Sequence, residues 1–169
     1  TGVASVAWNA RIMPIRITNE SNGAASWSDM ASGFLWAADH GARVANLSYH
    51  GAAGSSTVAN AANYMASKGG VVVVAAGNDN TDYGYNNYAS LVVAAATTSS
   101  DAKASYSSHG YFVDIAAPGS SIYTTSRSGG YSSVSGTSFA TPNTAAVAAL
   151  ILSANPSLNP SDVTAIMVN

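Results

Sequence analysis

The stretch Ser135-Gly136-Thr137-Ser138-Phe139-Ala140-Thr141-Pro142 opens the part of the sequence that decides the fold, and it continues through Asn143-Thr144 into an Ala/Val/Leu/Ile run that ends near Leu152. A glycine-led turn, a hydroxyl residue, a proline and then apolar helix formers predict a loop that leads into a helix. The helix is apolar on nearly every face, which predicts that it is buried. Asn155-Pro156 is expected to end it.

Ser138 has two possible roles at this helix start. The first N–H groups of a helix are unpaired and its dipole favours negative charge, which suits a developing oxyanion beside a serine nucleophile. Gly136 has no Cβ, so the backbone of a substrate could come close. A serine at such a place can also be a helix cap. These eight residues alone leave both roles open.

The composition is that of one domain with a sizeable core. The chain has 169 residues, of which 47% are hydrophobic and 8% charged, and its net charge is −2. Because no basic cluster occurs, we expect neither nucleic acid nor a membrane as a partner. The chain has no cysteine, which excludes disulfides and thiolate zinc sites. No apolar run is long enough for a bilayer and no signal peptide heads the chain, which is typical of a mature or processed piece.

Strand and helix signals alternate along the chain. The residues predict helices from Ser26 to Gly41, from Thr57 to Lys68, after Ser138 and from Pro160. Strands are expected over 11–17, 44–48, 71–76, 91–96, 112–116, 121–125 and 131–134, although Pro14 weakens the first. This order predicts an α/β fold, a doubly wound parallel sheet with helices on both faces. Ligands bind beyond the carboxyl ends of such strands, so Ser48, Asn78 and the turn before Ser138 should share one rim.

Three blocks resemble the subtilisin-like serine proteases (subtilases, peptidase family S8) and occur in the order of that family. Residues 46–51 are similar to the block that forms one wall of the substrate cleft. Residues 72–78 are similar to the strand that ends at the oxyanion-hole asparagine, and residues 136–142 to the nucleophile motif. The segments 104–108 and 114–119 are also similar, so the resemblance covers essentially the whole chain.

The resemblance implies a serine endopeptidase in which Ser138 is the nucleophile and the Asn78 amide donates to the oxyanion. It also implies that the cleft binds an extended protein or peptide substrate by backbone hydrogen bonds, with broad specificity. The residues expected to line this cleft are Ser48, Tyr49, His50, Gly51, Ala75, Ala76, Gly77, Gly136 and Thr137. His50 stands where the family usually has Gly. It could narrow or polarise a side-chain pocket, or it could be an exposed loop residue.

The family's Asp-Thr/Ser-Gly and His-Gly-Thr-His blocks do not occur, and none of His40, His50 and His109 resembles the catalytic base. Residues 1–169 are therefore interpreted as a single partial catalytic domain, incomplete at both ends, without the N-terminal Asp/His segment and the final C-terminal segment. That N-terminal segment is an expected partner, and this chain alone is expected to be inactive. The alternative is an inactive fragment or pseudoprotease that acts as a peptide-binding module. An esterase would carry a Gly-x-Ser-x-Gly elbow, which is absent.

We expect no cofactor for catalysis, and we assign no metal ligand. Structural calcium is possible because the family commonly uses it, and residues 78–82 alternate oxygen-bearing side chains. The glycine and the distal glutamate of a helix-loop-helix calcium site are, however, misplaced or absent. The resemblance also implies a secreted, extracellular protein.

Overall fold

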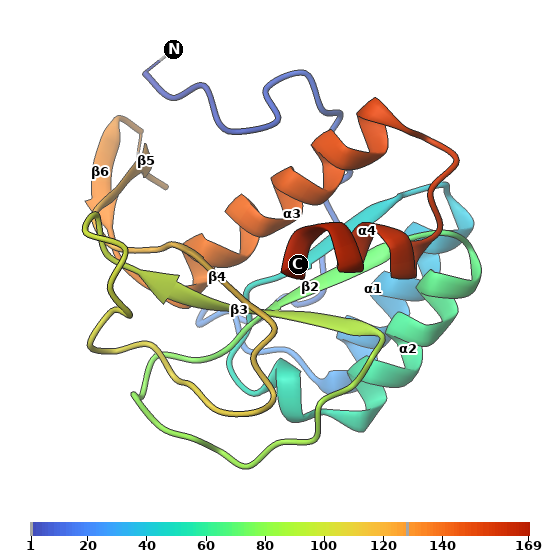
Figure 1. Cartoon of the computed structure of the whole chain (residues 1–169), viewed down its shortest axis with the longest axis horizontal. Coiled ribbons are helices and arrows are strands. Elements are labelled where there is room, and N and C mark those ends of the chain that lie inside the picture. Colours follow the sequence, from blue (N-terminus) through green and yellow to red (C-terminus); the bar gives the residue numbers. More distant parts are fainter. Residues whose placement is uncertain (1, 128) are drawn as a thin grey trace.

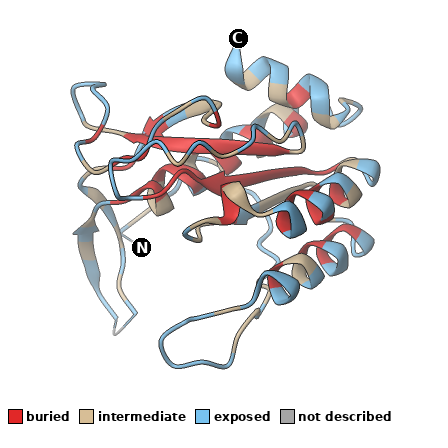
Figure 2. Ribbon diagram, turned by 90° about the horizontal axis from the view of Figure 1, so that it is seen from below, coloured by how far each residue is buried: buried red, intermediate tan, exposed pale blue. Residues whose placement is uncertain are grey.

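A four-stranded parallel sheet forms the centre of the computed structural model, which describes residues 2–127 and 129–169 (Figure 1). Its strands are β1 (Val44–Leu47), β2 (Val71–Ala75), β3 (Leu91–Thr97) and β4 (Ile115–Pro118), in that spatial order. Every neighbouring pair is parallel. All of β2 and nearly all of β3 are buried, as central strands of a parallel sheet are (Figure 2).

Helices cover both faces of this sheet, which confirms the predicted fold class (Figure 1). Helices α1 (Trp27–Asp39) and α2 (Ser56–Ser67) lie on one face, and α3 (Thr137–Ala154) and α4 (Pro160–Val168) lie on the other. Side chains of β2 alternate between two cores: Val72 and Val74 belong to the first, Val71 and Val73 to the second. This alternation follows from the period of two in a strand.

The strands of the parallel sheet are connected in two ways. Only β1 and β2 are joined through a helix of normal length, α2, which follows the short 3₁₀ helix η1 (Ala52–Gly54). Loops connect β2 to β3 and β3 to β4. Strands β5 (Ile122–Thr125) and β6 (Tyr131–Val134) pair antiparallel in a separate two-stranded sheet.

Two predicted strands differ from the structure. Residues 11–17 form no strand, because no described strand lies beside them to complete a ladder. Their side chains pack on α1 instead: a Cβ on Gly33 would lie 3.1 Å and 3.2 Å from methyl groups of Ile15 and Ile17. The strand expected over 112–116 begins only at Ile115, because the N–H of Val113 donates to the carbonyl of Gly110 in a turn.

The helix ends follow their capping residues. Ser26 accepts a hydrogen bond from the N–H of Asp29 at the start of α1, as predicted, and Asn155 ends α3. The predicted burial of α3 on nearly every face is wrong, since Val147 is 40% and Leu150 45% exposed. Both lie on the helix face turned away from the sheet, which the described chain does not cover. No described helix combines the length and apolarity needed to cross a bilayer.

Candidate functional site

Three segments meet at the start of α3: the loop after β1, the end of β2 and the turn that leads into the helix. The hydroxyl of Ser48 donates to the main-chain carbonyl of Ser138 over 2.9 Å. The N–H of Gly77 donates to Oγ1 of Thr137 over 3.2 Å. The carboxyl ends of β1 and β2 therefore lie at the helix start, on one rim of the sheet as predicted.

The carboxamide of Asn78 is held from one side only. Its Oδ1 accepts hydrogen bonds from the N–H of Thr137 at 2.8 Å and from the hydroxyl of Thr137 at 2.9 Å. Its Nδ2 has no acceptor among the described residues, and Asn78 is exposed. A Cβ on Gly136 would lie 3.5 Å from this nitrogen. The absence of that carbon leaves Nδ2 open for a group that approaches the helix start.

Ser138 is the second residue of α3 and does not cap it. The N-cap is Gly136, and no side chain makes a cap hydrogen bond there. The capping role considered for Ser138 is therefore wrong. The serine is half-buried, and its N–H has no acceptor in the described chain. Its main-chain N–H and the Asn78 amide are thus two unpaired donors at the positive end of an 18-residue helix.

The Ser48 bond compensates for a proline in the helix. Within an α-helix the carbonyl of Ser138 would accept from the N–H four residues later, but that residue is Pro142, which has none. The Ser48 hydroxyl supplies the missing donor. Further along, the hydroxyls of Thr141 and Thr144 donate back to the carbonyls of Thr137 and Ala140.

The other predicted cleft residues have different environments. The Tyr49 hydroxyl accepts from the N–H of Ala25 and donates to the carbonyl of Gly23, so its side chain is part of the packing against the segment before α1. Ala75 and Ala76 have buried side chains, which leaves only their backbone for a peptide. The side chain of Thr137 is completely buried. It positions Asn78 through a hydrogen bond and is not part of the cleft surface. Gly51 has φ of 77° and is the N-cap of η1.

A polar cluster beside Asn78 was not predicted. His50 Nδ1 lies 3.5 Å from Oδ2 of Asp79, and the Tyr83 hydroxyl donates to the same oxygen. Both the hydrogen bond to the Asp79 carboxylate and burial raise the pKa of Tyr83. The only sequence signal was the departure of His50 from the usual glycine.

The carboxylates of the loop that follows β2 have protein partners. Asp79 is engaged by His50 and Tyr83, and Oδ1 of Asp82 accepts from the N–H of Gly84. Within residues 2–127 and 129–169, no three His, Cys, Asp or Glu side chains form a cluster that could hold a metal ion. Structural calcium stays a prediction.

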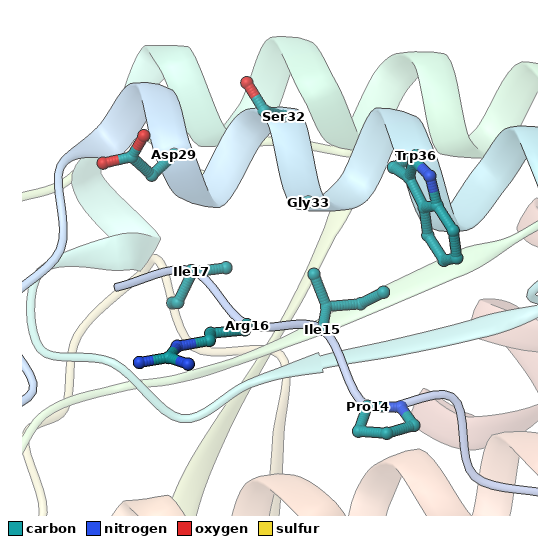
Figure 3. A pocket seen from close by; sticks show the side chains of 8 residues that line it. All are labelled: Pro14, Ile15, Arg16, Ile17, Asp29, Ser32, Gly33 and Trp36. Atoms are coloured by element: carbon teal, nitrogen blue, oxygen red, sulfur yellow. The ribbon is translucent and has the colours of Figure 1, made fainter. Parts of the chain in front are cut away.

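A surface cavity of roughly 440 Å³ lies away from Ser138, between α1 and the extended segment that precedes it (Figure 3). The side chains of Ile15 and Ile17 point toward α1 in this view. The cavity is lined by Pro14, Ile15, Arg16, Ile17, Asp29, Ser32, Gly33 and Trp36. None of these residues belongs to the candidate site.

A serine near a helix N-terminus, beside a fixed carboxamide on the carboxyl rim of a parallel sheet, is typical of serine hydrolases with an α/β fold. The model of the Subtilase family matches residues 1–169, so the chain belongs to the subtilase family of serine proteases. This match confirms the resemblance seen in the three sequence blocks.

Relatives in sequence and structure agree with this assignment. Thermitase of Thermoactinomyces vulgaris is 46% identical over 155 residues, which cover 90% of this chain and 55% of that protein. An extracellular protease of Xanthomonas campestris is 40% identical over 191 residues. The alignment covers 100% of this chain and 33% of that protein. A solved protease of Pseudoalteromonas arctica superimposes with a TM-score of 0.85 at 32% identity, over 96% of this chain and 56% of the other. The chain thus spans about half the length, or less, of these relatives.

Proposed function

We propose that this chain is the nucleophile-bearing part of a secreted serine endopeptidase that hydrolyses peptide bonds of proteins with broad specificity. The observation that carries the proposal is the pair of hydrogen bonds from Thr137 to Oδ1 of Asn78. They fix the carboxamide, and we propose that its Nδ2 and the N–H of Ser138 both donate to one oxygen atom. Removal of such a side-chain donor costs about 3 kcal/mol of transition-state stabilisation.

In the proposed reaction, the Oγ of Ser138 attacks the carbonyl carbon of the scissile peptide bond. The carbonyl oxygen becomes an oxyanion and receives hydrogen bonds from Nδ2 of Asn78 and from the N–H of Ser138. The proton of Ser138 passes to a histidine, which donates it to the leaving amine as the C–N bond breaks. A water molecule then hydrolyses the acyl-enzyme and restores the Ser138 hydroxyl, and an aspartate orients the histidine. We propose that this Asp/His pair comes from a segment outside residues 1–169.

The substrate is proposed to lie extended between the loop after β1 and the end of β2. Ser48, Tyr49, His50 and Gly51 would form one wall, and Ala75, Ala76 and Gly77 the other. Because two of these side chains are buried alanines, recognition there depends on backbone hydrogen bonds, which is consistent with broad specificity.

The unpaired edge of the sheet at β1 supports the proposal that another segment packs there. Strand β1 pairs only with β2 among the described strands, and residues 11–17 lie extended without a ladder (Figure 3). Ile12 is 85% exposed, and the outer face of α3 exposes Val147 and Leu150. Such apolar surface and an unpaired strand edge favour a covering element. We propose that the Asp/His segment covers them, and that this chain is inactive without it.

The test uses the encoded full-length protein and a fluorophosphonate label. Label on Ser138, together with casein hydrolysis that Ser138→Ala abolishes and Ser135→Ala leaves intact, supports the endopeptidase. Ser135 is the matched control because it lies three residues earlier and its Oγ accepts from the N–H of Ser121. Peptide binding without labelling or hydrolysis supports instead the alternative, an inactive peptide-binding module.

Location and calcium have separate tests. A secreted location is supported by the printed name of the Xanthomonas relative, an extracellular protease, and the activity should be recovered from the culture medium. No cofactor is proposed for the reaction itself. Unchanged peptidase activity with a lower melting temperature in EGTA would support structural calcium.

A further inference from the structure

The segment 104–108, which resembles the subtilases in sequence, runs beside the loop that carries Asn78. Its last residue, Ser108, is completely buried. The N–H of Ser108 donates to the carbonyl of Gly77 over 3.0 Å, and its Oγ accepts from the N–H of Asp79 at 3.3 Å. Gly77 and Asp79 are the two chain neighbours of Asn78. Ser108 therefore binds the main chain on both sides of the candidate oxyanion donor.

Further hydrogen bonds hold the next residues of this loop against the same segment. The Oγ of Ser108 also accepts from the N–H of Thr81, at 3.5 Å. The N–H of Asn80 donates to the carbonyl of Tyr106 at 2.8 Å, and its Oδ1 accepts from Nζ of Lys103 at 2.8 Å. Asn80 has φ of 50°, a left-handed conformation that few residues other than glycine adopt. The conformation of this loop thus depends on its contacts with residues 103–108.

Gly77 allows Ser108 to come this close. Its φ is 109°, and a Cβ at this position would lie 3.2 Å from Oγ of Ser108. A side chain at residue 77 would therefore press on the hydroxyl that holds the loop.

The carboxamide of Asn78 needs this support because its own contacts fix one atom only. Thr137 binds Oδ1, and Nδ2 has no acceptor among the described residues. With Oδ1 held, the direction of Nδ2 still depends on where the main chain places the Cα of Asn78. A small displacement of a donor from its productive position can cost a large part of the rate.

From this arrangement we propose that Ser108 is a positioning residue of the peptidase, which fixes the main chain on both sides of Asn78 and thereby directs Nδ2. This step rests on the proposed function. Because Ser108 is completely buried, it does not touch the substrate. Its loss should lower the rate of the chemical step and leave the binding of a peptide unchanged.

The experiment measures kcat, KM and the melting temperature of the full-length protease, with one peptide substrate. Ser108→Ala removes the acceptor of two N–H groups, and kcat should fall about fivefold, the scale of one hydrogen bond, with KM little changed. In an Asn78→Ala background the same substitution should cause no further fall in kcat, because the carboxamide that it positions is already absent.

The matched control is Ser90→Ala. The Oγ of Ser90 donates to the carbonyl of Ala59 at 3.0 Å, and Ser90 precedes β3, whose carboxyl end faces the site. This control should lower the melting temperature and leave kcat unchanged. If Ser108→Ala does not fold, Lys103→Ala takes its place, since Lys103 is exposed and binds the same loop. Its kcat should fall about twofold, and only while Asn78 is present.

Three results would overturn the inference: a wild-type kcat in Ser108→Ala, an equal fall of kcat in Ser90→Ala, or a full fivefold fall when Asn78 is already alanine. Where Lys103→Ala is the variant tested, an unchanged kcat has the same meaning. A wild-type kcat in Asn78→Ala itself would instead overturn the proposed function, so the two failures are distinguishable.

Discussion

The hydroxyl of Ser48 donates to the main-chain carbonyl of Ser138 over 2.9 Å, in place of a bond that the helix cannot make. Pro142 lies four residues after Ser138 and has no N–H to offer. A side chain from the loop after β1 thus holds the first turn of α3. This relationship gives Ser48 a positioning role that is distinct from contact with substrate.

Ser48→Ala should leave the Ser138 carbonyl without a donor in the described structure. We expect a loss of about 1 kcal/mol in the free energy of unfolding, with a several-fold fall in kcat because the first turn is less well held. Urea unfolding and steady-state kinetics measure the two effects. The double variant Ser48→Ala/Pro142→Ala restores an N–H at the proper place and should recover most of the stability. A double variant that is no more stable than Ser48→Ala would contradict the compensation.

Thr137→Val should impair the candidate oxyanion donor without touching it directly. The substitution removes the hydroxyl that donates to Asn78 Oδ1 at 2.9 Å and that accepts from the N–H of Gly77. We expect kcat to fall roughly tenfold, about 1.4 kcal/mol, with KM little changed. Thr137→Ser keeps the hydroxyl and is the matched control.

An Asn78→Ala background separates the two explanations for such a loss. If Thr137 acts by orienting Asn78, then Thr137→Val should cause no further fall in kcat when the carboxamide is already absent. A full additional tenfold fall would show that Thr137 acts by another route.

The regular elements could be predicted because their signals are local. The valine run of β2 is long enough for a buried strand, and Ser26 with Asp29 sets the start of α1. Residues 11–17 carry a comparable apolar signal and form no strand. A strand needs a neighbour for its hydrogen bonds, and a neighbour is not a property of the segment itself.

The candidate site could be predicted in outline only. Because parallel strands end on one rim, the sequence brings Asn78 and Ser138 together. The contacts of the Ser48 hydroxyl and of the cluster formed by His50, Asp79 and Tyr83 depend on how two loops direct their side chains, and loop conformation has no periodic signal. The same limit explains why the sequence predicts Thr137 at the cleft surface although its side chain is completely buried.

Arg43 should be important for stability because it joins both faces of the sheet. Its Nε donates to the carbonyl of Gly69 at 2.7 Å, before β2, and its two terminal nitrogens donate to the carbonyls of Pro156 and Leu158 at 3.1 Å each. Arg43→Ala should lower the free energy of unfolding by about 2 kcal/mol, since three charge-assisted bonds to carbonyls are lost at a partly exposed position.

Arg43→Lys tests whether geometry or charge matters. Lysine keeps the charge but cannot span three carbonyls with a planar fork, so it should recover less than half of the loss in urea unfolding. Arg11→Ala, which removes an exposed arginine with no hydrogen bond among the described residues, should be nearly neutral. Equal stabilities of Arg43→Ala and Arg11→Ala would contradict the role of the fork.

Asp114 should make stability depend on pH. Burial raises the pKa of this carboxyl above its ordinary value, although hydrogen bonds from the N–H of Val93 and from Asn87 oppose the rise. The native state therefore holds this proton more tightly than the unfolded state. The resulting stabilisation is complete below the unfolded pKa and is lost as pH rises through the native pKa.

Asp114→Asn removes this titration but keeps an oxygen that can accept from the N–H of Val93. Its free energy of unfolding should increase relative to that of the wild type as pH rises from acidic to neutral, whatever constant offset the weaker contact with Asn87 adds. Urea unfolding at several pH values measures this slope. Asp101→Asn controls for the loss of one negative charge, because Asp101 is exposed in a loop and asparagine tolerates its φ of 58°. A relative stability of Asp114→Asn that falls as pH rises would mean that the native state stabilises the carboxylate, the opposite of what its burial implies.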